Sequence, residues 1–422
     1  MIRLARKLWP LNRSLSGKGV DQSLKIIKKE IPINIIKFKS GTKVFDWRVP
    51  NIWEINDAWI KDSKDKKILN FKDNNLHVVG YSKYVNKILN LNNLKKKLHS
   101  FKNKPNAIPY VTSYYKKDWG FCIEHKKIKK LKKQKYRAYI EAKFKKGNLK
   151  IGELIIKGKS KKEILFSTYI CHPSMANNEI SGIAVSTFLA KWILKKKLKY
   201  TYRFLFLPET IGSIAYLSKK KDILKKNTIA GYVLTCIGDD RNYSLLESKD
   251  KNSLSNYIAK SVLKTRKKAK IYDWLKRGSD ERQYCSPGID LPIASLMRTK
   301  YGEYPEYHTS LDKIGSVVTN KGLLGGLKLV KDVVNCIEMQ TFPQSIKYCE
   351  PFLSKRNLYP TISKTGSVKR NTQNLLDFLS YCDGKKSILQ INNKIKLSQP
   401  ELKKILKILK YQKLIKINNY PI

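Results

Sequence analysis

Residues 162–197 read KEILFSTYICHPSMANNEISGIAVSTFLAKWILKKK, and this stretch decides the fold. Its first part, 162–172, is an apolar run typical of a buried strand, and 181–197 has the spacing of an amphipathic helix. Further strand patterns lie at 202–209, 229–238 and 291–298, and further helical patterns at 252–265 and 320–339. Strands that alternate with helices of this length predict an α/β core on a largely parallel sheet.

The chain before this stretch has a different texture. Residues 14–30 show helical spacing, whereas 31–157 contain short alternating or aromatic-rich runs separated by turns, such as 108–115. Such runs are typical of a β-rich domain. We expect its four tryptophans to be core and edge residues of that domain: Trp47, Trp53, Trp59 and Trp119.

The chain after the α/β pattern predicts a spacer at 341–369 and a small separate unit at 371–422. Ser398, followed by Pro400 and Glu401, marks a helix start. The unit looks like a winged helix. A role in DNA binding would need one strongly basic recognition helix, and a protein–protein or dimerisation role fits the pattern equally well.

The charge of the chain is strongly positive. It has 87 Lys and Arg against 33 Asp and Glu, a formal net charge of +54. The excess is mostly Lys spread over the whole length, together with many Ile and Asn, which indicates a general composition bias. We therefore do not expect specific binding of nucleic acid, although the field attracts anions non-specifically.

Compartment and membrane association can also be predicted. The seven Cys are scattered without a CxxC pair, which is typical of a reducing compartment. No apolar run is long enough for a signal peptide or a membrane span. We expect a cytoplasmic protein.

Polar residues follow the predicted strands where the strands end. His172 follows the first strand, Glu209 the second and Asp239-Asp240 the third, while His308 lies in a distant loop. In open α/β sheets, ligands bind at the carboxyl ends of the strands. Two imidazoles and a carboxylate suit zinc, and Glu209 is the best candidate for the base that takes a proton from water.

Five segments resemble a bacterial family of aminopeptidase-like proteins: 172–182, 208–218, 234–240, 277–297 and 301–312. The core of this family is similar to the zinc aminopeptidases and glutaminyl cyclases. Residues 45–55, 73–82 and 108–122 resemble the β-domain inserted into that core, and the C-terminal unit resembles its winged helix. The resemblance implies a mixed sheet flanked by helices, with the core at 1–35 and 158–345, the insertion at 36–157 and the winged helix at 355–422.

The resemblance also implies site residues. His172 and His308 match metal ligands, and Glu209 matches the segment that supplies both a ligand and the general base. Zinc aminopeptidases have two adjacent glutamates there, so one role is missing or the two are merged. Asn178 stands at the metal-bridging aspartate, and Thr235 at another ligand, with Asp239 and Asp240 as substitutes. We therefore expect one zinc ion rather than two.

Residues 277–282 match a serine–aspartate segment that lines the pocket in zinc aminopeptidases. We expect Asp280 to support catalysis by orienting a ligating imidazole, as Asp312 could for His308. Asp280 and Glu281 would form an acidic lip for the free amino group of a substrate. Arg282 and Tyr307 are further candidates for substrate contacts, and the Arg side chains here suit a carboxylate or an anionic substrate.

These observations leave three hypotheses for function. The leading one is metal-dependent hydrolysis of an amide, either at the N-terminal residue of a peptide or on a modified sugar of surface-polysaccharide biosynthesis. The second is an aminopeptidase-like scaffold that binds a ligand or partner without catalysis, as Asn178 and the single Glu209 suggest. The third is a nucleic-acid-binding regulator. A homo-oligomer is compatible with all three.

Overall fold

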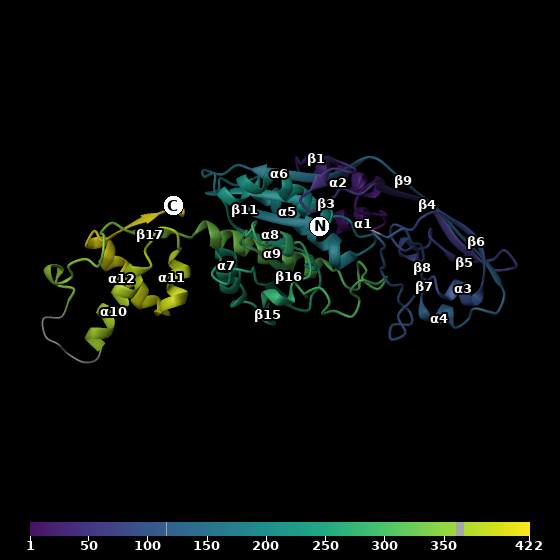
Figure 1. Cartoon of the computed structure of the whole chain (residues 1–422). Coiled ribbons are helices and arrows are strands. Elements are labelled where there is room, and N and C mark those ends of the chain that lie inside the picture. Colours follow the sequence, from purple (N-terminus) through teal and green to yellow (C-terminus); the bar gives the residue numbers. More distant parts are fainter. Residues whose placement is uncertain (115, 360–366) are drawn as a thin grey trace.

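The computed structural model describes residues 1–114, 116–359 and 367–422. Tyr115 in the expected run 108–115, and residues 360–366 in the expected spacer and winged helix, lie outside the described residues. Figure 1 shows the C-terminal unit, the α/β core and the β-rich insertion following one another across the molecule. No helix in the described part of the chain is long and apolar enough to cross a membrane.

The core is built on a mixed sheet, which has eight strands among the described residues. Its four central strands run parallel, and an antiparallel pairing joins each outer pair to them. In spatial order the strands are β1 (Asn34–Lys39), β10 (Asn148–Ile156), β12 (Thr201–Leu207), β11 (Glu163–Tyr169), β13 (Thr228–Leu234), β16 (Ile293–Met297), β14 (Tyr243–Leu246) and β15 (Ala269–Tyr272). The predicted α/β core with a largely parallel centre is confirmed.

Helices cover both faces of this sheet. Alternate residues of β11 point to opposite faces, so Ile164 and Phe166 pack in one apolar core and Leu165 in the other. Both faces are covered, which explains why the strand is a continuous apolar run. The first face carries α1 (Ile2–Leu8), α2 (Lys18–Glu30), α5 (Ser181–Ile193), α7 (Leu254–Leu263) and α9 (Asn320–Glu338), and the second α6 (Ile211–Asn227) and α8 (Glu281–Tyr284).

The insertion (residues 40–147) leaves the core sheet after β1 and returns to it with β10. Its largest sheet, in spatial order, consists of β5 (Lys67–Asn70), β4 (Ile52–Lys61), β9 (Lys135–Lys145) and β6 (Val85–Asn90). Shorter elements complete it: β2 (Lys43–Val44), β3 (Trp47–Arg48), η1 (Asn75–His77), α3 (Leu91–Lys95), β7 (Leu98–His99), β8 (Phe121–Cys122) and α4 (His125–Ile128). The expected limits 36–157 therefore included strands of the core sheet, because an alternating pattern does not tell which sheet a strand joins.

The C-terminal unit has a separate apolar core. It contains β17 (Phe342–Ser345), η4 (Ser354–Arg356), α10 (Ser367–Ser380), α11 (Ile388–Ile395), α12 (Gln399–Tyr411) and β18 (Ile415–Asn418). The capping box of Ser398 and Glu401 begins α12 as predicted. β17 pairs with β18, so residues 342–345, which we expected in the core and the spacer, belong to this unit. The unit contacts the core where Tyr420 packs on Tyr200.

Candidate active site

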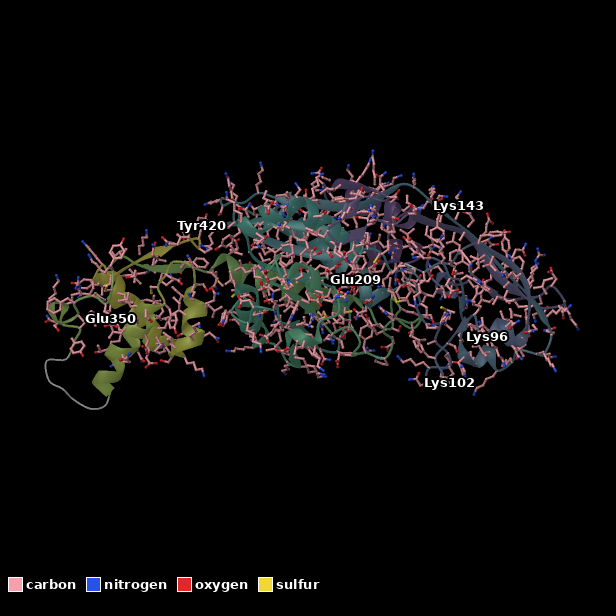
Figure 2. All side chains as sticks on the ribbon, in the orientation of Figure 1. Lys96, Lys102, Lys143, Glu209, Glu350 and Tyr420 are labelled. Carbon is pink, nitrogen blue, oxygen red and sulfur yellow. The ribbon has the colours of Figure 1, made fainter. Side chains whose placement is uncertain are left out.

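A cavity of about 400 Å³ lies where the loops after β11 and β12 meet the insertion. Parallel strands end at the same edge of the sheet, which brings these two loops together. Figure 2 shows Glu209 near the middle of the molecule, away from both of its ends. The core contributes Leu15, Cys171, His172, Glu209, Thr210, Ile211, Arg282 and His308, and the insertion contributes Trp47, Tyr110, Thr112 and Tyr114.

Glu209 stands on a strained turn between β12 and α6. Thr210 has φ 63° and ψ −75°, and the N–H of Ile211 donates to the carbonyl of Glu209 at 2.8 Å. This is a γ-turn with a positive φ, a rare conformation that costs free energy in a β-branched residue. Asp280 holds the turn by accepting hydrogen bonds from the Thr210 N–H at 2.7 Å and the Ser213 hydroxyl at 2.9 Å. The turn fixes the direction in which the Glu209 side chain leaves the sheet.

The carboxyl group of Glu209 reaches two partners. Its Oε1 accepts a hydrogen bond from the Ser279 hydroxyl at 2.7 Å, and its Oε2 lies 3.7 Å from His172 Nε2. Burial raises the pKa of Glu209, while the neighbouring His172 acts to lower it. A carboxylate whose pKa is raised toward neutrality is a stronger base, and this is what a general base near pH 7 requires.

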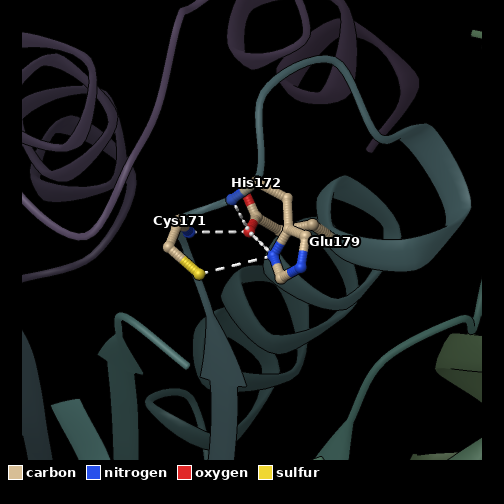
Figure 3. A group of neighbouring side chains, drawn as sticks. All are labelled: Cys171, His172 and Glu179. Carbon is tan, nitrogen blue, oxygen red and sulfur yellow. Dashed lines mark hydrogen bonds and ion pairs between the residues drawn. The ribbon is translucent and has the colours of Figure 1, made fainter. Parts of the chain in front are cut away.

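Glu179 orients His172 (Figure 3). The Nδ1 of His172 lies 3.1 Å from Glu179 Oε2, so Nδ1 carries the proton and donates it to the carboxylate. Burial lowers the pKa of His172, but the hydrogen bond and charge of Glu179 outweigh it and the net pKa is raised. The other ring nitrogen, Nε2, is left on the side of Glu209, 3.7 Å from its Oε2. This is the arrangement of a metal-ligating histidine.

The side chains of Cys171, His172 and Glu179 lie close enough to hold an ion, with ligand atoms within 4.8 Å of one another. The hydrogen bonds of these side chains argue against coordination of an ion by this group. Glu179 already accepts from the N–H groups of Cys171 and His172 and from Arg13 Nε, at 2.6 Å from Arg13. Burial raises the pKa of the Cys171 thiol well above its usual range, so the thiol stays protonated. The group therefore positions His172 rather than coordinating an ion through Glu179.

His308 presents a nitrogen without a partner to the same region. Its backbone is left-handed, with φ 53°, and its ring stacks on Tyr307 with centroids 3.9 Å apart. The ring centroid lies 5.5 Å from that of His172. His308 Nε2 is buried and makes no hydrogen bond to the described residues. Burial lowers the pKa of His308 to about 3, so the imidazole is neutral and able to bind a metal.

The donor set fits a zinc ion. Two imidazoles and one carboxylate line the same cavity, and this is the set of three protein ligands found in many catalytic zinc sites. A buried nitrogen without a partner is costly, and a bound cation would satisfy His308 Nε2. The residues that would hold the ion are His172, Glu209 and His308.

Comparison with known proteins identifies the family. Residues 2–340 match the family described as "Domain of unknown function (DUF4910)", and residues 340–417 match a winged helix-turn-helix family. The chain belongs to the DUF4910 family. It is 42% identical over 391 residues to a Clostridium acetobutylicum protein, covering 92% of this chain and 89% of that protein. That protein is provisionally named as a polysaccharide biosynthesis protein with an aminopeptidase-like domain.

Solved structures show the same fold. A Clostridium acetobutylicum protein provisionally named a peptidase is 40% identical, with a TM-score of 0.81 over 98% of this chain and 95% of its own. A zinc aminopeptidase from Bacillus subtilis has a TM-score of 0.58 at 14% identity, covering 79% of this chain and 92% of its own. The expected aminopeptidase-like core with a C-terminal winged helix is confirmed in this DUF4910 protein.

The structure gathers four of the predicted site residues around the cavity: His172, Glu209, Arg282 and His308. Asp280 was expected to orient a ligating imidazole. It instead accepts hydrogen bonds from the turn that follows Glu209. Tyr307 lies behind His308 rather than on the cavity wall. Asp312 also differs from expectation, because it accepts the N–H groups of Asn177 and Asn178 at 2.7 and 3.0 Å.

Three further residues that were predicted to bind the metal or the substrate make other contacts in this structure. Asp240 is exposed and accepts a hydrogen bond from Thr319, so it does not join the two histidines. Glu281 is buried and accepts from four donors, Gly278 N–H, Ser279 N–H, Tyr301 OH and Ser295 OH, so it offers no lip to a substrate. The side-chain oxygen of Asn178 accepts from Tyr169 OH at 3.0 Å, and its NH₂ group cannot ligate a cation.

Two groups of residues at the site were not predicted from the sequence. The first group lies in the insertion and lines the cavity: Trp47, Tyr110, Thr112 and Tyr114. In the sequence, the aromatic-rich pattern of this region indicated only a β-rich domain. Glu179 follows His172 by seven residues, but the segment between them is irregular up to Ala176, so no regular spacing indicated its role. Arg13 is 166 residues from Glu179 and has no local signal.

Proposed function

We propose that this DUF4910 protein is a metal-dependent hydrolase of amide bonds. The observation that carries the proposal is that His172, Glu209 and His308 line one cavity, with His172 Nε2 at 3.7 Å from Glu209 Oε2 and with His308 Nε2 buried and without a partner among the described residues. When bound, zinc supplies Lewis-acid polarisation of the amide carbonyl and lowers the pKa of water. One ion fits better than two, because the oxygen of Asn178 is engaged by Tyr169 and Asp240 lies at the surface.

The residues of the chain divide the remaining work. Glu209 takes the proton from the attacking water as the new C–O bond forms, and returns it to the amide nitrogen as the C–N bond breaks. Ser279 holds Oε1 of this carboxylate, and the strained turn at Thr210 limits its movement. Glu179 keeps His172 in the tautomer whose Nε2 faces Glu209. Because one glutamate stands where zinc aminopeptidases have two, Glu209 combines both roles.

The class of substrate is an amide, either at the N-terminal residue of a peptide or on a modified sugar. The name of the Clostridium acetobutylicum relative supports the second, since it places that protein in polysaccharide biosynthesis. All seven cysteines are free, which supports a reducing, cytoplasmic compartment.

A second candidate function is that of a non-catalytic scaffold with the same fold. The observation that favours it is Asn178, whose neutral side chain stands where the resemblance implied a metal-bridging aspartate. A scaffold would bind a ligand in the same cavity without turnover.

The test is hydrolysis of aminoacyl 4-nitroanilides and N-acylated amino sugars by the zinc-loaded protein. We expect Glu209→Gln to lower kcat by about 10²- to 10⁴-fold, because the base is removed. Glu350→Gln is the matched control, since Glu350 is exposed in the C-terminal unit, far from Glu209 in Figure 2. Absence of any turnover, or turnover unaffected by Glu209→Gln, would leave the scaffold as the function.

A further inference from the structure

The charges around the cavity differ from those that an amino group requires. An ammonium group is bound by carboxylates, and the sequence had offered Asp280 and Glu281 for this purpose. Both are completely buried. Glu281 is occupied by four donors, and Asp280 accepts from the Thr210 N–H and Ser213. Among the described residues that line the cavity, Glu209 is the only carboxylate, and the proposed chemistry already uses it.

Arg282 provides the opposite charge at the cavity wall. Its guanidinium is anchored by two hydrogen bonds, from Nε to the Ser279 carbonyl at 2.9 Å and from Nη2 to the Thr210 hydroxyl at 3.2 Å. A guanidinium has five N–H donors, so three remain for a ligand. The side chain is exposed and forms no ion pair with a carboxylate of the described residues. Its anchors belong to the two loops that hold Glu209.

The residues of the insertion that line the cavity carry no charge. Tyr110 and Tyr114 share a hydrogen bond between their hydroxyls at 2.8 Å, and burial raises the pKa of both well above the usual range. Thr112 and Trp47 are the other residues of the insertion that line the cavity. Aromatic faces and neutral hydroxyls suit an uncharged ring or chain, and they leave Arg282 as the group that selects for charge.

We infer that Arg282 binds an anionic group of the substrate, a carboxylate or a phosphate close to the scissile amide, and that the site does not select for a free ammonium. The inference rests on the proposed function, because it describes the substrate of the same cavity. Arg is the side chain best suited to such oxyanions, since its planar fork donates two parallel hydrogen bonds to them.

The experiment compares 4-nitroanilides that differ only in the end group of the acyl chain. The succinyl compound carries a carboxylate, the 3-phosphonopropanoyl compound a phosphonate, the β-alanyl compound an ammonium, and the propanoyl compound no charge. We expect the zinc-loaded wild type to cleave one of the two anions at least about tenfold better in kcat/KM than the β-alanyl compound. The preferred anion distinguishes a carboxylate from a phosphate.

Variants separate recognition from positioning. Arg282→Gln removes a charge-assisted contact, so we expect kcat/KM for the preferred anion to fall about 10- to 100-fold, and that for the propanoyl compound less than about threefold. A residue that merely supports the loops of Glu209 would lower all four values equally. Arg277→Gln is the matched control, because Arg277 is exposed five residues before Arg282 and stacks on Trp274 outside the cavity.

A binding measurement keeps this inference distinct from the proposed function. Titration of the protein with succinate and with inorganic phosphate is followed by calorimetry in the wild type, Arg282→Gln and Arg277→Gln. Binding that depends on Arg282 without any turnover would reject the hydrolase and retain the anion site. Turnover with a preference for β-alanyl, or an equal loss for all four compounds in Arg282→Gln, would overturn the anion site and retain the hydrolase. Neither turnover nor binding that depends on Arg282 would overturn both.

Discussion

Asp280 is a buried carboxyl group whose ionisation the fold opposes. Burial, and secondly the charge of Glu209, raise the pKa of Asp280 from 3.8 to about 8. A proton that the folded state holds more tightly than the unfolded state stabilises the fold. This contribution is complete below about pH 4 and is lost as the pH rises to about 8.

Asp280→Asn should remove this pH dependence. The amide keeps an oxygen for the Thr210 N–H and the Ser213 hydroxyl but cannot ionise. We expect the unfolding free energy of the metal-free wild type to fall relative to the variant between pH 5 and pH 8, measured by urea denaturation. Asp222→Asn, at an exposed aspartate, is the control. Parallel pH profiles for the wild type and Asp280→Asn would show that Asp280 is ionised in the fold at neutral pH.

At the scale of elements, the segment between α1 and α2 is tied to the loop after β11 by one buried ion pair. Arg13 and Glu179 have fully buried side chains, and Arg13 Nη1 also donates to the carbonyl of Leu8. Through Glu179 this segment reaches Nδ1 of His172. The N-terminal helices therefore complete the site as well as covering the sheet.

Replacing only one partner of the ion pair between Arg13 and Glu179 should destabilise the protein, because the charge of the other partner then stays buried without a counter-charge. Arg13→Gln and Glu179→Gln each leave a buried charge alone, and we expect each to cost about 3–5 kcal/mol of unfolding free energy. The double variant should cost clearly less than the sum of the two, and the zinc affinity of Glu179→Gln should fall about 10- to 100-fold. Chemical denaturation and chelator competition measure the two effects. Additive losses in the double variant would show that the two side chains act independently.

The type of an element, helix or strand, was easier to predict from the sequence than the sheet to which a strand belongs. The run 162–172 and the capped start of α12 have local patterns that determine strand and helix, and both formed as predicted. One partner of β10 is β1, more than 100 residues earlier, and the partner of β17 is β18 at the other end of its unit. Pairing at such distances leaves no local pattern, so the sequence did not indicate which sheet these strands join.

The same difference between local patterns and tertiary packing explains which residues of the candidate site were expected from the sequence. His172, Glu209 and His308 were expected at one site because each follows a strand or belongs to a recognisable motif, and the structure brings all three to one cavity. Glu281 was misassigned because a sequence does not tell a satisfied buried carboxylate from a free one. The cavity residues of the insertion were not predicted, because the placement of the insertion over the cavity depends on tertiary packing. These residues are Trp47, Tyr110, Thr112 and Tyr114.

At the scale of the whole molecule, the net charge of +54 should dominate binding to nucleic acid. Lysines are spread over the molecule, and Figure 2 labels three of them, Lys96, Lys102 and Lys143, on the insertion rather than on the winged helix. Binding through dispersed charge depends on the release of counterions and not on base sequence.

We therefore expect affinity for duplex DNA to fall linearly with salt on logarithmic axes, with the same slope for unrelated sequences. Fluorescence anisotropy between about 50 and 200 mM salt measures this dependence, over which several phosphate contacts would cost more than about tenfold in affinity. Retention of tight binding to one sequence at the higher salt would instead assign the winged helix a specific DNA site.

The metal centre is the central claim, and the metal content of the purified chain tests it most directly. Elemental analysis of the wild type, His172→Ala and His308→Ala, after incubation with zinc and removal of the excess, gives the number of ions per chain. We predict about one zinc in the wild type and none in either variant, because each removes one of three protein ligands. A wild type without metal, or variants that retain it, would contradict the account.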